Sequence, residues 1–209
     1  MAKIKIYGAA NTSAGRCIWT MEELELNYDV VPVDLRAKEH KSPEYLRLNP
    51  NGKVPCLIDG DFALWESVAI NHYLCEKHRP TMLGHGHQER ALVHQWSIWC
   101  MTELQPPMID LLIQSKFVPE DKRDNTHIEK LQQRIPHILQ VLEQHLEGKT
   151  YMVGQEFTLA DLNVASVVRI AEVVQIPVTN FNNLDTWLQK IKARPAYQRY
   201  IDLRKQSAH

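Results

Sequence analysis

The residues best suited to chemistry lie within residues 49–70, at Val54-Pro55 and at Glu66-Ser67. Proline cannot donate to a β-ladder, so a strand containing Pro55 is an edge there or has its backbone turned outward. An X-Pro bond can also be cis, which would aim the Val54 amide and carbonyl out of the sheet. Ser67 is expected at a helix N-terminus, where free amides favour a carboxylate. The pattern suits an extended, peptide-like ligand; an ordinary edge hairpin with a serine helix cap is the simpler alternative.

Turn residues divide the same stretch into a hairpin and a helix. Residues 49–52 have turn chemistry, an apolar run follows over 54–58, and the sequence of residues 59–61 reverses the chain. Residues 62–64 run back, which completes a hairpin. A helix is predicted from Glu66-Ser67 to about His78.

The residues before the hairpin predict a strand, a helix and a second strand. Residues 4–7 form a short strand, and an apolar stripe at helical spacing starts at about Ala14. Residues 28–35 are typical of a second strand, and the polar residues 36–44 contain a helix start at Ser42-Pro43. This order of elements is that of a thioredoxin-like domain.

The loop Asn11-Thr12-Ser13 lies between the first strand and the first helix. Ligands of open α/β sheets tend to bind at such a place. Asn, Thr and Ser are also the preferred N-capping residues, so capping alone explains the loop without a ligand.

Residues 49–70 resemble the glutathione-binding stretch of the cytosolic glutathione transferase family. The residues that carry the resemblance are in order and correctly spaced: Asn49-Pro50, Gly52-Lys53-Val54-Pro55, Leu57, Asp59-Gly60, Leu64, Glu66-Ser67 and Ala69-Ile70. The resemblance covers nearly the whole chain. It implies an α/β thioredoxin-like N-terminal domain followed by an all-helical (all-α) C-terminal domain.

The resemblance implies how glutathione would bind. The Val54 backbone would pair with the peptide of glutathione, and Glu66 and Ser67 would hold its γ-glutamyl end. His40 and Lys53 would hold its glycyl end, because two cations suit one carboxylate. A solvated polar face is the alternative for His40 and Lys53.

The resemblance also implies that the loop stabilises the thiolate of glutathione, which is the nucleophile. A free thiol has a pKa of about 8.5, and about 1.4 kcal/mol of differential stabilisation lowers it by one unit. The phi-like, theta-like and bacterial nu-like classes align differently with the loop, so Ser13, Thr12 and Asn11 all stay candidates. Tyr7 matches the catalytic position of tyrosine-type classes less well, and Cys17 is expected in a helix core.

The C-terminal half has helical periodicity throughout. We expect a domain over residues 1–79, a linker over 80–88 and a helical domain over 89–209. Pro106-Pro107 is expected to break the first long helix, and Thr158 is expected to cap a later helix with Asp161.

In the family, an apolar electrophile lies near the first long helix of this half. For this chain the resemblance implies contacts from Trp96, Trp99 and Met101, although an aromatic stripe is usually core. His85 and His87 are spaced as a metal pair, but nothing completes a ligand set, so no metal is expected.

Composition limits the other classes of function. The formal charge is −1, which gives no electrostatic argument for nucleic acid, and no apolar run approaches membrane-spanning length. No signal peptide is apparent, and the four widely spaced cysteines are typical of reduced thiols in a cytoplasmic protein.

The sequence therefore predicts a homodimeric, cytoplasmic glutathione transferase with a role in detoxification. Its substrates would be glutathione, as co-substrate, and a small hydrophobic electrophile. A glutathione-dependent disulfide reductase and a non-catalytic interaction module with the same fold are the alternatives. The intact Glu66-Ser67 pair favours glutathione binding over an interaction module.

Overall fold

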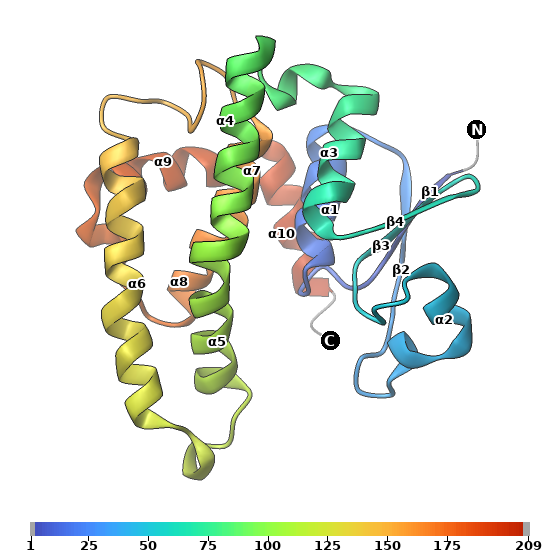
Figure 1. The fold of residues 1–209 in the computed structure, drawn as a ribbon, viewed down its shortest axis with the longest axis horizontal. Coiled ribbons are helices and arrows are strands. Elements are labelled where there is room, and N and C mark those ends of the chain that lie inside the picture. Colours follow the sequence, from blue (N-terminus) through green and yellow to red (C-terminus); the bar gives the residue numbers. More distant parts are fainter. Residues whose placement is uncertain (1–2, 207–209) are drawn as a thin grey trace. The chain divides into compact units, whose positions relative to one another are not determined.

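The computed structural model describes residues 3–206 of the 209-residue chain. The chain forms two units, one from residues 1–82 and 193–209 and the other from residues 83–192. The first contains a small sheet and the second is helical (Figure 1). The predicted fold class is confirmed.

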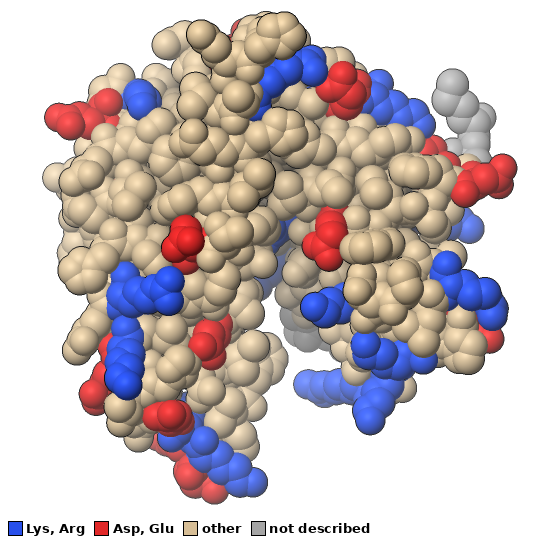
Figure 2. Space-filling view, viewed as in Figure 1, with Lys and Arg blue, Asp and Glu red and all other residues tan. Residues whose placement is uncertain are grey.

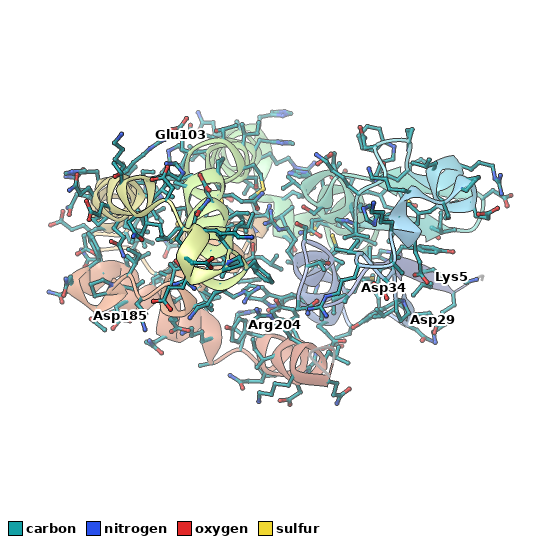
Figure 3. All side chains as sticks on the ribbon, turned by 90° about the horizontal axis from the view of Figure 1, so that it is seen from below. Lys5, Asp29, Asp34, Glu103, Asp185 and Arg204 are labelled. Carbon is teal, nitrogen blue, oxygen red and sulfur yellow. The ribbon has the colours of Figure 1, made fainter. Side chains whose placement is uncertain are left out.

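The sheet has four strands in the order β2-β1-β3-β4. β1 (Ile4–Tyr7) runs parallel to β2 (Tyr28–Val31), and Lys5 is in register with Asp29 (Figure 3). β3 (Cys56–Asp59) and β4 (Phe62–Trp65) form the predicted antiparallel hairpin. β2 is shorter than the predicted 28–35, because the strand ends before Pro32, which has no N–H to donate.

Alternate side chains of β1 pack on opposite faces of this sheet. Ile4 and Ile6 are buried on the face covered by α1 (Ala14–Glu23) and α3 (Ser67–His78), which pack against each other (Figure 1). Tyr7 points to the other face, where its ring meets the ring of Tyr45 at 6.1 Å.

The second face carries the short helix α2. α2 (Pro43–Leu48) is capped by Ser42, whose side chain accepts the Tyr45 amide at 3.2 Å, and it follows a 3-10 turn at Glu39–Lys41. Tyr45 is the only residue of α2 that is buried. The predicted helix start at Ser42-Pro43 is confirmed.

The last helix, α10 (Pro195–Gln206), belongs to the sheet unit. This differs from the predicted helical domain of 89–209. The physical reason is its packing on α1: Trp19 contacts Tyr197 and Tyr200 at ring distances of 4.9 and 5.9 Å. The Arg194 guanidinium also donates to both oxygens of Glu23, at 2.8 and 2.7 Å.

The helical unit is built from six α-helices and short 3-10 turns within residues 83–192. Its helices are α4 (Gly86–Trp99), α5 (Gln105–Lys116), α6 (Asn125–His145), α7 (Leu159–Val168), α8 (Ile170–Val173) and α9 (Asn182–Lys192). Pro106-Pro107 does not break the first long helix as expected. A π-helical turn at Cys100–Leu104 continues α4 into α5, and the prolines occupy the first turn of α5, where no N–H is needed.

The predicted capping box at Thr158 and Asp161 is confirmed. The Asp161 carboxylate is fully buried and accepts the amides of Met152 and Thr158 at 2.8 and 2.9 Å, and the Trp187 indole N–H at 2.9 Å. Burial raises the pKa of Asp161, and these hydrogen bonds act in the opposite direction. This aspartate holds the helical unit together.

Within residues 3–206, no helix is both long and apolar enough to cross a membrane.

Candidate functional site

The loop between β1 and α1 carries three polar side chains, which differ in their hydrogen bonding and exposure. The Thr12 hydroxyl is occupied: it donates to the Ala9 carbonyl at 2.7 Å and accepts the Ala14 amide at 3.2 Å. Asn11 and Ser13 are exposed. Ser13 stands at the N-cap position of α1 but makes no capping hydrogen bond. Of the two hydroxyls, that of Ser13 is therefore the one free to donate to a ligand.

Gly8 brings Val54 against this loop. A Cβ at Gly8 would lie 3.0 Å from the Cβ atoms of both Ala14 and Val54, and its φ is +121°. A side chain here would push the start of α1 away from Val54, so glycine is required for the close approach. The Val54 side chain therefore lies close to this loop.

The Val54 peptide is available for pairing. The Val54-Pro55 bond is cis, as the sequence suggested. Within the described residues, neither the N–H nor the carbonyl of Val54 has a hydrogen-bond partner. The Lys53 carbonyl next to it is occupied, since it accepts the Tyr45 hydroxyl at 2.7 Å and the Asn49 side-chain amide at 2.6 Å.

Glu66 and Ser67 stand at the N-terminus of α3. Glu66 is exposed and has φ +71°, a conformation that costs about 1–3 kcal/mol for a residue other than glycine and is common at ligand sites. The first turn of α3 carries no acidic side chain, so its free amides are open to an external carboxylate. Cys17 of α1 donates its thiol to the Ser67 carbonyl at 3.5 Å, which places the first turns of α1 and α3 side by side.

His40 and Lys53 are brought close by Gly52. A Cβ at Gly52 would lie 2.7 Å from the His40 carbonyl, so the turns that carry His40 and Lys53 are packed together. The Nδ1 atom of His40 is buried and has no hydrogen-bond partner among residues 3–206, and Lys53 is exposed. A buried polar atom without a partner is costly, so it suits a site completed by a ligand.

The charge around these turns is positive. Residues 34–53 contain five lysines or arginines and three acidic residues. In Figure 2, Lys and Arg side chains gather over the part of the sheet unit labelled α2 in Figure 1. Such a surface attracts an anionic ligand.

Tyr7 and the cysteines are unsuited to act on a ligand at this surface. Tyr7 points to the face of the sheet that carries α2. All four cysteines are free and buried, as expected for Cys17. Burial raises the pKa of Cys56 to about 11 and that of Cys75 to about 12, so neither supplies a thiolate near neutral pH.

The helical-unit residues predicted to meet an electrophile differ in exposure. Trp96 is 6% exposed and packs on Trp99 and His145, with ring distances of 5.2 and 4.2 Å, as a core residue does. Trp99 and Met101 are half-buried. Sequence reasoning missed the exposed apolar side chains of α4 and α5, such as Ile98 and Ile113, because a helical stripe does not reveal which face lacks a cover.

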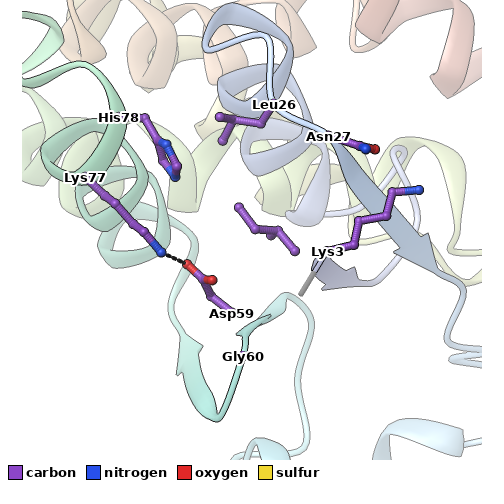
Figure 4. Close-up of a pocket in the computed structure, with 8 residues that line it drawn as sticks. Lys3, Leu26, Asn27, Asp59, Gly60, Lys77 and His78 are labelled. Atoms are coloured by element: carbon purple, nitrogen blue, oxygen red, sulfur yellow. Dashed lines mark hydrogen bonds and ion pairs between the residues drawn. The ribbon is translucent and has the colours of Figure 1, made fainter. Parts of the chain in front are cut away.

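A large cavity of the sheet unit, about 520 Å³, lies elsewhere (Figure 4). It is lined by Leu26, after the end of α1, and by Lys77 and His78 at the end of α3, where Lys77 pairs with Asp59 at 2.5 Å. A helix rises about 1.5 Å per residue, so these ends lie roughly 15 Å from the N-termini that carry Ser13 and Ser67. This cavity is therefore separate from the candidate site.

No group of three or more His, Cys, Asp or Glu side chains suited to a metal is found within the described part of the chain. His85 lies 3.5 Å from the carboxylate of Glu156.

Sequence reasoning also missed the residues that support the site. Tyr45 and Asn49 fix the Lys53 carbonyl, and Gly8 and Gly52 permit the close approaches. The glycines were visible in the sequence, but the atoms that they approach come from distant segments.

Comparisons with known proteins show matches to family models over both parts of the chain. The family models for the N-terminal and C-terminal domains of glutathione S-transferase match residues 2–76 and 104–195. A probable glutathione S-transferase of Oryza sativa is 34% identical, and glutathione S-transferase 1 of Zea mays is 33% identical, each over the full length of both chains.

Solved structures give the same result. Glutathione S-transferase I from maize, in complex with an atrazine–glutathione conjugate, has a TM-score of 0.90 and 31% identity. The match covers 99% of this chain and all of that one. Poplar glutathione transferase F1 has a TM-score of 0.89 and 27% identity over 99% of this chain and all of that one.

Proposed function

Because this chain belongs to the glutathione S-transferase family, we propose that it joins glutathione to hydrophobic electrophiles. Relatives of similar length carry the same name, and one solved relative holds an atrazine–glutathione conjugate. The protein acts as a cytoplasmic homodimer in this proposal, as the sequence resemblance implies.

One observation carries the proposal most directly. Val54, whose peptide groups have no partner among residues 3–206, has its side chain next to the start of α1, with Gly8 between them. A peptide bound to Val54 would place its neighbouring groups beside Ser13 on one side and the α3 N-terminus on the other. Glutathione is a short peptide with a thiol at its centre and a carboxylate at each end, so it matches this arrangement.

Each end of glutathione meets a group of suitable charge. The free amides at Ser67 donate to the γ-glutamyl carboxylate, and the Glu66 carboxylate is placed for the adjacent ammonium. His40 and Lys53 receive the glycyl carboxylate, which completes the hydrogen bonding of the buried His40 nitrogen. The net positive charge of residues 34–53 favours an anionic tripeptide.

We assign thiolate stabilisation to Ser13 rather than Thr12 or Asn11. The Ser13 hydroxyl is exposed and free at the N-terminus of α1, whereas the Thr12 hydroxyl is used within the loop. Donation from Ser13 and the positive end of the α1 dipole lower the thiol pKa, and the proton passes to solvent. The sulfur lone pair then forms the S–C bond with the electrophile, whose leaving group departs with its bonding electrons.

The second substrate is a small hydrophobic electrophile, and Trp99 and Met101 are the half-buried residues proposed to contact it. Trp96 is assigned to the core of the helical unit, because it is 6% exposed.

The test measures glutathione binding by calorimetry and conjugation of 1-chloro-2,4-dinitrobenzene. Ser13→Ala should reduce kcat/KM about 10²–10³-fold and raise the pKa of the bound thiol, followed by thiolate absorbance, because it removes a donor to the anion. Thr12→Ala is the matched control and should leave that pKa unchanged.

The outcomes separate the alternatives. A raised thiol pKa in Thr12→Ala alone would transfer the role to Thr12. Turnover of a glutathionyl disulfide without conjugation would assign the protein to disulfide reduction. No glutathione binding at all would leave a non-catalytic interaction module.

A further inference from the structure

A second cavity of about 400 Å³ lies under α2, on the sheet face that Tyr7 joins. Its walls include the rings of Tyr7 and Tyr45 and the side chains of Pro32 and Leu48. The two rings meet edge to face, at 6.1 Å and an interplanar angle of 67°. This cavity is large enough for a small aromatic molecule, and part of its wall is apolar and aromatic.

The charged groups that line the cavity are two carboxylates, those of Glu39 and Glu44. Glu39 uses its Oε2 atom to accept the Asp34 amide at 2.7 Å, and its other oxygen has no partner within residues 3–206. Ser42 lines the cavity beside it. Glu44 is 3.8 Å from Arg47, but both side chains are at least 70% exposed. This ion pair is therefore weak and leaves the negative charge of Glu44 largely in place. Of the lining residues that the structure describes, none is a lysine or arginine.

We propose that this cavity binds a small organic cation, an aromatic ring carrying a primary ammonium group. The ring would pack on Tyr7 and Tyr45, and the ammonium would donate to the free Glu39 oxygen and to Ser42. Aromatic walls also favour a cation, because the face of each ring is negative.

The exposed lysines and arginines of residues 34–53 act against a cation, but none of them lines the cavity. Salt at physiological strength screens exposed charges beyond about 8 Å, whereas Glu39 would be in direct contact with the ammonium.

The cavity shares a wall with the groups proposed to hold the glycyl end of glutathione. Tyr45 lines the cavity and donates its hydroxyl to the Lys53 carbonyl at 2.7 Å. Glu39 precedes His40 in the same 3-10 turn, which Gly52 approaches closely. A ligand that fixes α2 would therefore fix His40 and Lys53, and glutathione should bind more tightly. This coupling, unlike the cation site itself, rests on the proposed function.

Binding is tested without glutathione, with three probes of one shape: phenethylammonium, phenylacetate and 2-phenylethanol. Calorimetry should give a Kd on the order of 1 mM for the ammonium and at least tenfold weaker binding for the others. NMR shifts should fall on Leu48 and Tyr45. Equal binding of all three, or tighter binding of phenylacetate, would overturn the proposal.

Glu39→Gln should weaken phenethylammonium binding about tenfold, because the amide keeps the Asp34 hydrogen bond and loses the charge. Glu147→Gln, an exposed carboxylate of the helical unit, makes the same charge change and should have no effect. Undiminished binding in Glu39→Gln would overturn the site.

Coupling is read from the Kd of glutathione with and without saturating phenethylammonium. We expect about fivefold tighter binding, and the same factor for the ammonium when glutathione is saturating. Tyr45→Phe keeps the ring and removes the hydrogen bond to Lys53, so the ammonium should still bind while the factor falls toward one. An unchanged factor in Tyr45→Phe would overturn this route, whereas absence of glutathione binding would count against the proposed function and not against the cation site.

Discussion

One face of the four-stranded sheet is covered by α1 and α3, and α10 packs on α1. In the described part of the chain, the other face carries only the short helix α2. On the first face, Cys17, Ile18, Trp19 and Met21 of α1 are all 0% exposed, and α10 packs on the same helix. On the second face, only Tyr45 of α2 is buried, and a cavity lies beneath it.

The two ends of the candidate site depend on different faces of the sheet, and these faces differ in packing. Ser13 and Ser67 begin α1 and α3 and are fixed by the dense face, which suits the precise placement of a reacting sulfur. His40 and Lys53 depend on the sparse face, which suits binding that adjusts to a ligand. Stability and reactivity should respond separately to changes on the two faces.

The largest effect is expected from Trp19→Ala. Trp19 is fully buried, stacks on Tyr200 and donates its indole N–H to Glu23 at 3.1 Å. Its loss should reduce the free energy of unfolding by about 3–5 kcal/mol in denaturant titrations. Leu48→Ala is the matched change on the α2 face and should cost about 1 kcal/mol. Equal losses would remove the distinction between the faces.

Gly15→Ala tests how firmly the dense face fixes the loop. A Cβ at Gly15 would lie 2.3 Å from the Ala10 carbonyl oxygen and 2.9 Å from the Tyr200 hydroxyl, so the loop must move. We expect kcat/KM for conjugation to fall about 10²-fold, since a shift of about 1 Å can have that effect. Gly60→Ala is the control: nothing lies within 4 Å, so activity should persist despite the strain of its φ of +63°. Full activity in Gly15→Ala would contradict a rigid loop.

Cysteine labelling compares the faces in the unmodified protein. Cys56 lies under α2, with its thiol directed at the Leu48 carbonyl at 3.6 Å, and Cys17 lies between α1 and α3. Because labelling requires local opening, iodoacetamide should modify Cys56 at least about tenfold faster than Cys17, measured by peptide mass spectrometry.

The pH dependence of that labelling provides its control. Burial raises the pKa of Cys56 to about 11, so less thiolate is present in the closed state than in an open one at any pH below that value. A rate that follows an ordinary thiol pKa of about 8.5 indicates opening of α2. A rate that increases until pH 11 would show instead that the reagent reaches the closed state.

The smallest effect is expected from Arg199→Ala. Arg199 donates to Glu22 at 2.5 Å, but its side chain is 49% exposed, so the cost should be below about 1 kcal/mol. Arg194→Ala leaves Glu23, a 4% exposed carboxylate, without its cationic partner and should cost about 2 kcal/mol. A larger loss of stability in Arg199→Ala than in Arg194→Ala would mean that the exposed contact between Arg199 and Glu22 is the one that holds α10 on α1.

Much of the fold could be predicted from the sequence, because local sequence signals agreed with the tertiary structure. Turn residues, the proline in the first strand of the hairpin and the Thr158–Asp161 pair each act within a few residues, so the hairpin and the capping box were predicted. The break at Pro106-Pro107 was wrong, because a π-helical turn can precede prolines in a first helical turn without interrupting the chain of helices.

The candidate site was harder to predict from the sequence, because the residues that position it are distant from it along the chain. The sequence could not rank Ser13 above Thr12, since the difference lies in which hydroxyl the Ala9 carbonyl and the Ala14 amide occupy. Likewise, the place of α10 depends on rings and charges about 175 residues from the helix that they contact.

The return of α10 to the sheet unit affects the order in which the protein can fold during synthesis. Residues 83–192 are made between the two parts of this unit. At about 5–20 residues per second, a ribosome needs roughly 6–20 s to make them. Throughout that interval the surface of Trp19 that later stacks on Tyr200 has no partner. The first part of the protein to be made is thus among the last to be completed, and the surface of Trp19 is covered only when the final helix arrives.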